Sequence, residues 1–395
     1  MLRPQLKQLV SSTGLLEPAR QIRRSLSVKQ RVREYGASEQ IYVGFQPDHT
    51  VVHCGNAAIW LNASVRSEPL LRGMVDHFHF HHSAVAPRLV DGVSVADFSK
   101  RAVHRLTRLG GEVELTFHND YIAIRKGERE IRIRPSHHVY VWDMGNFFDY
   151  YHGAVVPEMR NGVAVVDYSR PKLHQLRRSG VEFEFPSLPE SDESTEPYLS
   201  ILQPKEGDAI LDLGAYAGAS AFFLSRAVGP SGLIVSLEPD ATNFRYLQAN
   251  IARHQLRNVK PVQKGVWKER GTLAFQAEGS MGSSVVEIIR RDSSVKKVEV
   301  MTLEDAAALL EGRTVAAVKM DIEGAELAVL QNSAEFLRRH RARFIVEVHF
   351  IDGVQPVEEV CEIFRAADYS VDLPLQGTGG GGLVAAWPNS AHLPK

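Results

Sequence analysis

The sequence predicts an α/β protein: a doubly wound sheet in the back half, preceded by a duplicated α+β region. Strand-like and helix-like segments alternate from Gly207 onward, which is typical of a doubly wound sheet. The front half repeats itself at a constant offset, and repeats of this kind indicate a duplicated supersecondary unit. A stretch rich in proline, serine and acid, 188–200, lies between the halves and is expected to be a linker.

Composition excludes several classes of protein. The formal net charge of −1 gives no electrostatic reason for a nucleic-acid partner. The two cysteines, Cys54 and Cys361, are far apart, so we expect no disulfide framework and a cytoplasmic location. No apolar run in the sequence is long enough for a transmembrane helix.

The N-terminal segment 1–39 is basic. Residues 1–34 carry eight lysines and arginines against two glutamates. We expect a solvated basic helix that leads into the first domain. The alternatives are an organelle presequence or a helix in weak contact with an anionic membrane surface.

The repeat aligns 74–115 with 144–185 without gaps, and 17 of the 42 paired residues are identical. It predicts two α+β modules, 40–117 and 118–187. Each copy begins with a hairpin, in "TVVHCGNAAIWL" and "YIAIRKGEREIRI". A strand follows, then a short helix capped by Ser99 or Ser169, then a second alternating strand in "EVELTF" or "VEFEFP".

The histidine-rich stretch "HFHFHH", 77–82, alternates histidine with phenylalanine. We expect a strand that is structural or contacts a substrate. Metal binding by alternating histidines is the alternative. The second copy reads "FFDYYH" there and keeps only His152, which favours the structural interpretation.

The elements expected in the back half follow in order. The strands are "DAILDLG", "LIVSLEPD", "VKPVQKGVW", "VAAVKMDIE", "FIVEVHF" and a terminal pair, "YSVDL" and "GGLVAAW". The helices are "ASAFFLSRAVG", "ATNFRYLQANIARHQ", "TLEDAAALLEG", "GAELAVLQNS" and "VEEVCEIFRAAD".

The first two strands end in residues suited to a nucleotide. In sheets of this kind, ligands bind beyond the carboxyl ends of the strands. The loop "DLGAYAG" contains Asp212, Gly214, Ala215, Tyr216 and Gly218. Its glycines allow close approach of the backbone, and the following helix offers free N–H groups. Glu238 ends the next strand along the chain, where a carboxylate can accept both ribose hydroxyls. The pair indicates an adenosine-type cofactor.

Two later strands end in charged residues. Lys319, Asp321 and Glu323 share one face of "VAAVKMDIE" by alternation, and Glu347 and His349 share a face of "FIVEVHF". If these strands are neighbours, five polar groups converge beside the cofactor loop. The alternative is a structural ion-pair cluster, because Lys319 could neutralise a buried carboxylate.

Residues 205–388 resemble the FkbM family of S-adenosylmethionine-dependent methyltransferases. The resemblance rests on "ILDLGAYAGASAFFLS", "VSLEPDATNFRYLQANIARH", "VKMDIEGAELAVL" and "IVEVHF". It implies a class I methyltransferase fold with seven strands and an antiparallel final hairpin. It also implies S-adenosyl-L-methionine as cofactor and O-methylation of a hydroxyl on a sugar, glycan or polyketide-like acceptor.

The resemblance also implies roles for residues. The loop from Asp212 to Gly218 would surround the methionine part of the cofactor, although Tyr216 stands where many relatives have glycine or asparagine. Glu238 would bind the ribose, and Asp321 would lie where cofactor and acceptor meet. His349 is the expected general base, with Glu323 or Glu347 next in line. Alternatively, Asp321, Glu347 and His349 could ligate a metal.

Two other functions stay open from the sequence. One is a nicotinamide-dependent oxidoreductase, which the terminal antiparallel pair disfavours. The other is a binding protein in which the repeats hold a glycan or a partner and the sheet is a relic. The presence of both Asp212 and Glu238 argues against a relic.

Overall fold

The computed structural model describes residues 41–276, 284–285, 295–350, 354–373 and 382–389. The predicted basic segment 1–39 lies outside these residues. The chain divides into two compact units, Met1–Arg170 and Pro171–Lys395. Among the described helices, none has the length and apolar character that crossing a membrane requires. Cys54 and Cys361 are buried and are not joined by a disulfide.

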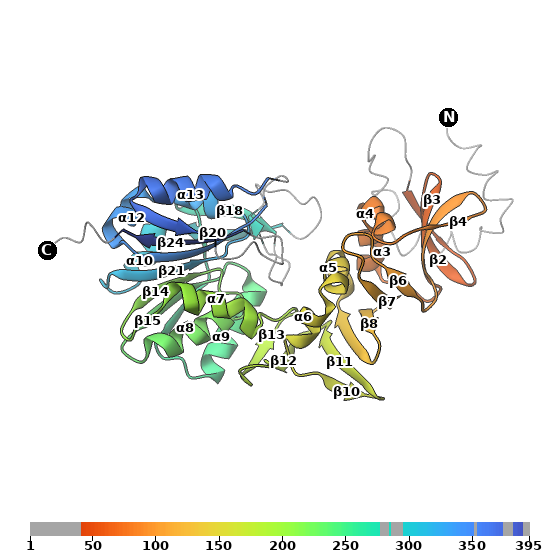
Figure 1. Cartoon of the computed structure of the whole chain (residues 1–395), viewed down its shortest axis with the longest axis horizontal. Coiled ribbons are helices and arrows are strands. Elements are labelled where there is room, and N and C mark those ends of the chain that lie inside the picture. The colour runs from red at the N-terminus through yellow and green to blue at the C-terminus, as the bar shows by residue number, and fades with distance from the viewer. Residues whose placement is uncertain (1–40, 277–283, 286–294, 351–353, 374–381, 390–395) are drawn as a thin grey trace. The chain divides into compact units, whose positions relative to one another are not determined.

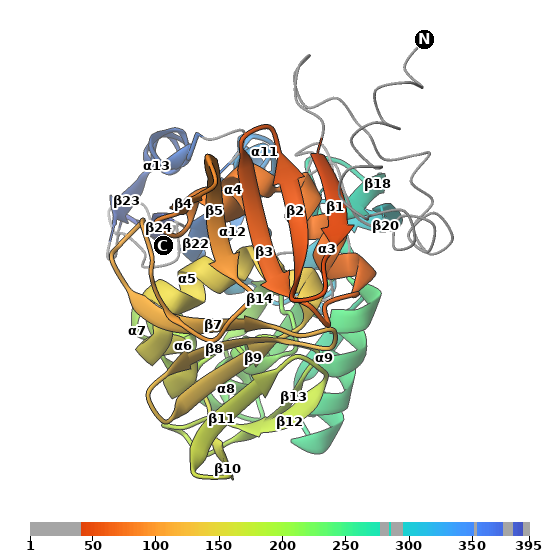
Figure 2. The same cartoon turned by 90° about the vertical axis from the view of Figure 1, so that its right-hand side faces the viewer.

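Within its described residues, the first unit contains two sheets, which Figure 2 shows as two runs of neighbouring strands. The first sheet has the strand order β1-β2-β3-β5-β4. Its strands are β1 (Ile41–Phe45), β2 (His49–Cys54), β3 (Ala57–Asn62), β4 (Arg88–Val90) and β5 (Val93–Phe98). Helices α3 (Glu68–Asp76) and α4 (Phe78–Ser83) lie between β3 and β4 in the chain.

The second sheet has the order β10-β11-β9-β8-β7-β6. Its strands are β6 (Val103–Arg105), β7 (Glu112–Phe117), β8 (Ile122–Lys126), β9 (Arg129–Ile133), β10 (Glu158–Arg160) and β11 (Val163–Tyr168). A 3₁₀ helix, η2 (Pro135–Tyr140), and helices α5 (Val141–Asn146) and α6 (Phe148–Gly153) connect β9 to β10.

The two copies of the repeat fold alike, as predicted. Strands β4 and β5 of the first copy recur as β10 and β11 of the second, at the positions that the ungapped alignment pairs. Equivalent contacts recur with them. His82 Nε2 lies 2.9 Å from the carbonyl oxygen of Ser94, and His152 Nε2 lies 2.9 Å from that of Ala164. The repeated histidine therefore serves the fold, by holding a helix to a strand.

Two local predictions in the repeat are wrong. The stretch 77–82 belongs mainly to helix α4 and is not a strand. It follows α3 directly, and His81 is buried against His138 and Trp142, so helical packing overrides the alternation. The short helices expected after Ser99 and Ser169 are instead hairpins, because Gly110 and Gly180 turn the chain at φ angles of 70° and 71°.

The hairpin that ends each copy associates with the part of the chain that follows that copy. In the first copy, β6 and β7 join the second sheet through β8. The equivalent hairpin of the second copy, β12 (Lys172–Gln175) with β13 (Glu182–Phe185), belongs to the second unit. There β13 packs against helix α9 (Ala241–Arg253), and Asn250 bonds to both the backbone N–H and the carbonyl of Glu184.

The expected linker 188–200 is instead a packed segment. Residues 185–191 are all buried, and Ser191 caps helix α7 (Asp192–Leu202) by accepting the N–H of Ser194. Acids at the start of this helix are favourable beside its free N–H groups. The acidic composition thus marks a helix N-terminus, and the preceding prolines do not mark flexibility.

The second unit is built on a seven-stranded sheet with the order β16-β15-β14-β21-β22-β24-β23 (Figure 1). The strands are β14 (Ala209–Leu213), β15 (Leu233–Leu237), β16 (Val259–Val262), β21 (Val315–Met320), β22 (Arg343–Val348), β23 (Tyr369–Asp372) and β24 (Gly382–Pro388). The first five are parallel, and β24 pairs antiparallel with both β22 and β23. The predicted doubly wound sheet with an antiparallel final hairpin is confirmed.

Helices cover both faces of this sheet. The remaining ones are α8 (Ala219–Val228), α10 (Leu303–Ala308), α11 (Glu326–Gln331), α12 (Ala334–His340) and α13 (Val357–Ala366). Side chains of α10 to α13 form one apolar core with alternate strand residues such as Leu211, Val318 and Val346. The intervening strand residues face the other way, where α7 contacts β21 and β22 and α8 contacts β14 and β15.

A small second sheet was not anticipated. The expected strand "VKPVQKGVW" breaks into β16 and β17 (Gly265–Val266). The latter joins β18 (Gly271–Gln276), β19 (Ser284–Val285) and β20 (Val295–Met301) in the order β17-β20-β18-β19.

Candidate active site

The loop between β14 and α8 is held in a left-handed conformation. Gly214, Tyr216 and Gly218 have φ angles of 78°, 46° and 89°, a region that favours glycine. A Cβ at Gly214 would lie 1.7 Å from the carbonyl oxygen of Asp321. One at Gly218 would lie 2.7 Å from Leu247 Cδ1. Glycine is therefore required because the loop packs against the protein itself as well as facing the carboxyl end of the sheet.

Tyr216 ties this loop to the segment before α7. Its hydroxyl donates to the carbonyl of Leu188 at 2.8 Å, and its ring stacks on Phe185 with centroids 6.2 Å apart. Its backbone N–H donates to Glu238. The departure from the family pattern at Tyr216 thus has a structural reason in this chain.

Glu238, directly after β15, is buried and holds two backbone N–H groups. One oxygen accepts from Tyr216 at 2.9 Å and the other from Asp240 at 2.8 Å. Burial raises the pKa of Glu238 to about 8. Each carboxylate oxygen has a second lone pair, so both can still accept a hydroxyl from a ligand.

Lys319 is fully buried on the sheet face that carries α7 and α8. Its ammonium donates to the carbonyl of Gly214 and lies 3.8 Å from Asp212 and 3.6 Å from Asp321. Burial opposes its charge, but these carboxylates outweigh burial and raise the pKa of Lys319. Lys319 therefore joins the loop, β14 and the segment after β21.

Asp212 is also fully buried. It accepts hydrogen bonds from the hydroxyls of Ser220 and Ser236 at 3.0 to 3.2 Å. Burial raises the pKa of Asp212, and Lys319 and the hydroxyls oppose the shift. With these partners, Asp212 positions the loop.

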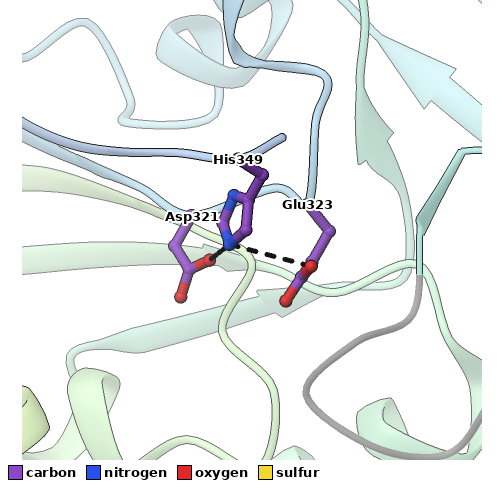
Figure 3. Close-up of side chains that lie close together, drawn as sticks. All are labelled: Asp321, Glu323 and His349. Carbon is purple, nitrogen blue, oxygen red and sulfur yellow. Dashed lines mark ion pairs between the residues drawn. The ribbon is translucent and has the colours of Figure 1, made fainter. Parts of the chain in front are cut away.

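Asp321, Glu323 and His349 converge at the ends of β21 and β22, which are neighbours as anticipated. His349 Nε2 lies 3.7 Å from Asp321 Oδ1 and 3.7 Å from Glu323 Oε2. Figure 3 shows the imidazole nitrogen between the two carboxylates. All three side chains are partly exposed, by 20 to 26%, so they are accessible to a ligand.

The other ring nitrogen of His349, Nδ1, is held by a carboxylate on the next helix, α11. Nδ1 lies 3.0 Å from Oε1 of Glu326, which is buried. The same carboxylate accepts the backbone N–H groups of Ile322 and Gly324. Glu326 therefore both shapes the turn after β21 and orients the imidazole.

Charge in this cluster favours an imidazolium. Burial disfavours a charged ring, but Glu323, Glu326 and Asp321 outweigh burial and raise the pKa of His349 well above its usual value. Burial in turn raises the pKa of Glu323, while His349 opposes that shift. The charge of Asp321, then burial, raises the pKa of Glu347.

Three of these groups could hold a metal ion. Ligand atoms of Asp321, Glu323 and His349 all lie within 4.8 Å of one another. Carboxylate and imidazole are ligands of several divalent cations. The set differs from the one considered from sequence, because Glu323 takes the place of Glu347.

Two residues at this site were missed from sequence, and both come from the expected linker. Glu190 is buried, and its charge interacts with those of Lys319, Asp212 and Asp321. Tyr198 of α7 is buried too, and Lys319 Nζ lies 5.4 Å from its ring centroid. The apolar and aromatic residues within "FPSLPESDESTEPYL" were the available signal.

Comparison with known proteins adds the family. A sequence model described as Methyltransferase FkbM domain matches residues 212–371. A crystal structure of methyltransferase FkbM from Methylobacillus flagellatus KT aligns at 16% identity, covering 63% of this chain and 54% of that chain, with a TM-score of 0.35. Precorrin-6y C5,15-methyltransferase from Geobacter metallireducens GS-15 aligns at 14% identity, covering 52% and 94% respectively, with a TM-score of 0.34.

A curated relative matches over a shorter stretch. It is a tRNA (cytosine(72)-C(5))-methyltransferase from Pyrococcus horikoshii, 28% identical over an alignment of 118 residues that covers 26% of this chain and 30% of that protein. The chain thus spans under a third of that relative's length. The family match and the seven-stranded sheet agree with the resemblance drawn from the sequence. Residues 212–371 therefore form a methyltransferase domain of the FkbM type, a family that uses S-adenosyl-L-methionine.

Proposed function

We propose that the protein transfers the methyl group of S-adenosyl-L-methionine to a hydroxyl of a sugar, glycan or polyketide-like acceptor. The observation that carries the proposal is the cluster of Asp321, Glu323 and His349 beside the glycine loop. Transfer to a hydroxyl releases one proton, so the site needs a group that accepts it. The cluster supplies such groups at the strand ends where the fold binds ligands.

The residues present fit the cofactor. Each oxygen of Glu238 retains acceptor capacity for a ribose hydroxyl. Helix α8 begins at Gly218, which supplies no side-chain cap. The N–H of Ala219 donates to Glu190, and the positive end of the helix dipole favours an anionic group near the rest of this first turn. When bound, the cofactor supplies an electrophilic methyl group. The chain's own residues would orient the acceptor oxygen and take its proton.

Glu323 is the better candidate for the base. Nearby carboxylates raise the pKa of His349 well above its usual value and favour its charged ring, which makes it the less suitable proton acceptor of the two. The raised pKa of Glu323 makes its carboxylate more basic than usual. We assign proton acceptance to Glu323, orientation of the hydroxyl to Asp321, and stabilisation of both carboxylates to the His349 imidazolium.

The alternatives are less well supported. A nicotinamide-dependent oxidoreductase is disfavoured by the antiparallel pair β23–β24 and by the family match. A relic sheet with a binding function is disfavoured because the buried acids of the loop keep their partners.

Isotopically methyl-labelled cofactor tests the proposal. After incubation of the full chain with a panel of sugars, glycans and other hydroxyl compounds, mass spectrometry should find the label on an oxygen. Label recovered only on nitrogen, sulfur or carbon would overturn the assignment to O-methylation.

Two variants then identify the base. Glu323→Gln should reduce turnover on the order of 100- to 10,000-fold, the usual contribution of a general base, while the affinity for S-adenosylhomocysteine is kept. His349→Gln should move the acid limb of the pH–rate profile to higher pH, because the imidazolium that lowers the pKa of Glu323 is gone. Glu335→Gln is the control, because Glu335 is exposed on α12.

A different outcome would assign the base to His349. If His349→Gln lowers the plateau on the order of 100- to 10,000-fold without moving the limb, and Glu323→Gln is active, His349 is the base.

A further inference from the structure

The segment before α7 places one acid inside the site. Residues 185–191 are buried, and the bond from Tyr216 to Leu188 fixes them to the glycine loop. Glu190 is 6% exposed, so its side chain points into the protein. A buried acid requires partners, because an uncompensated charge is costly.

Only part of that requirement is met. One oxygen of Glu190 accepts the backbone N–H of Ala219, the first residue of α8. The other, Oε2, has no hydrogen-bond partner among the described residues. Burial raises the pKa of Glu190 to about 8, and Lys319 opposes the shift. The bond to Ala219 holds this carboxyl at the start of α8.

The surrounding charges favour a cation. Glu190 interacts with Asp212, Asp321 and Lys319, and with Tyr198 from α7. This set holds three carboxyl groups against one ammonium. Lys319 is already engaged with Gly214, Asp212 and Asp321, so a second positive group would be stabilised here.

We propose that Glu190 Oε2 accepts a hydrogen bond from the α-ammonium group of the methionine part of the cofactor. This inference rests on the proposed function for the identity of the ligand. The ammonium has both a positive charge and N–H donors. The sulfonium has no donor, and the ribose hydroxyls are neutral, so neither matches a buried, unpartnered carboxylate as well.

A pair of ligands isolates this contact. S-adenosylhomocysteine carries the α-ammonium, and 5′-methylthioadenosine lacks the amino-acid portion. Glu190→Gln should lower the affinity for S-adenosylhomocysteine on the order of 10- to 100-fold, which is the scale of a lost hydrogen bond to a charged group. It should change the affinity for 5′-methylthioadenosine less than about twofold. Calorimetry measures both, with Glu193→Gln, an exposed site on α7, as control.

Proton exchange is an independent readout. Burial raises the pKa of Glu190 to about 8, which favours the protonated carboxyl at pH 7, whereas pairing with an ammonium favours the ionised carboxylate. Titration of S-adenosylhomocysteine at pH 7 in buffers of different ionisation enthalpy should show the wild type releasing a proton that Glu190→Gln does not release.

The outcomes separate the two proposals. If the wild type binds neither ligand, the proposed function fails. If the wild type binds both and Glu190→Gln leaves both affinities unchanged, or weakens both equally, the ammonium contact is refuted. Retained affinity of the variant for 5′-methylthioadenosine also shows that its site is folded.

Discussion

Replacing Lys319 by methionine tests whether the buried ammonium holds the site together. The side chain is fully buried and contacts Asp212, Asp321 and the carbonyl of Gly214. Removing one partner of a buried ion pair costs about 3–5 kcal/mol, because the other charge stays buried without compensation. Methionine keeps most of the apolar volume, so lost packing adds little.

The penalty should depend on pH. Asp212 already has a raised pKa from burial, and loss of Lys319 raises it further. A group whose pKa is raised on folding contributes stability while it is protonated, and that stability is lost as pH rises through its folded pKa. Lys319→Met should therefore cost more at pH 8 than at pH 5. The double variant Lys319→Met/Asp212→Asn should recover part of the loss at pH 8.

Native-state hydrogen exchange of peptides that cover β14 and β21 measures the free energy of opening of this sheet alone. This choice avoids the assumption that a chain of two units unfolds in one step. Lys205→Met, at an exposed position, is the control. A loss below about 1 kcal/mol at pH 8, within the range of exposed ion pairs, would refute the reasoning.

Two further predictions follow from the same site. Glu238→Gln should weaken the binding of S-adenosylhomocysteine by about 1.5–3 kcal/mol. The reason is that one acceptor oxygen becomes an NH₂ donor, which then faces the N–H of Tyr216 or Asp240. Equal affinities of variant and wild type by calorimetry would contradict the ribose assignment. Ethylenediaminetetraacetate should leave the rate of methyl transfer unchanged, because the His349 imidazolium already supplies positive charge among Asp321, Glu323 and Glu326. A rate lost with the chelator and restored by Mg²⁺ would instead identify Asp321, Glu323 and His349 as metal ligands.

The sequence by itself determined the sheet and the polar residues at the carboxyl ends of its strands. The sequence shows these features through local signals, which are the alternation of strands and helices, the glycine loop and Glu238. Such signals can be recognised because periodicity and turn chemistry depend on residues that are close together in the sequence. The same is true of the pairing of Lys319 with Asp321 along one strand face. The ungapped repeat likewise predicted that both copies fold alike.

Tertiary structure decided those features that depend on contacts between distant parts of the chain. The stretch 77–82 alternates like a strand but forms α4, because His81 packs against η2 and α5 through His138 and Trp142. The acidic segment 188–200 has the composition of a linker. Its first residues, 188–191, are nevertheless buried, and Tyr216, distant from Leu188 along the chain, holds them against the glycine loop. That contact also places the buried side chain of Glu190 in the site. The position of Glu323 beside His349 depends in the same way on the pairing of β21 with β22. Such contacts join residues that are distant in sequence, so only the folded chain specifies them.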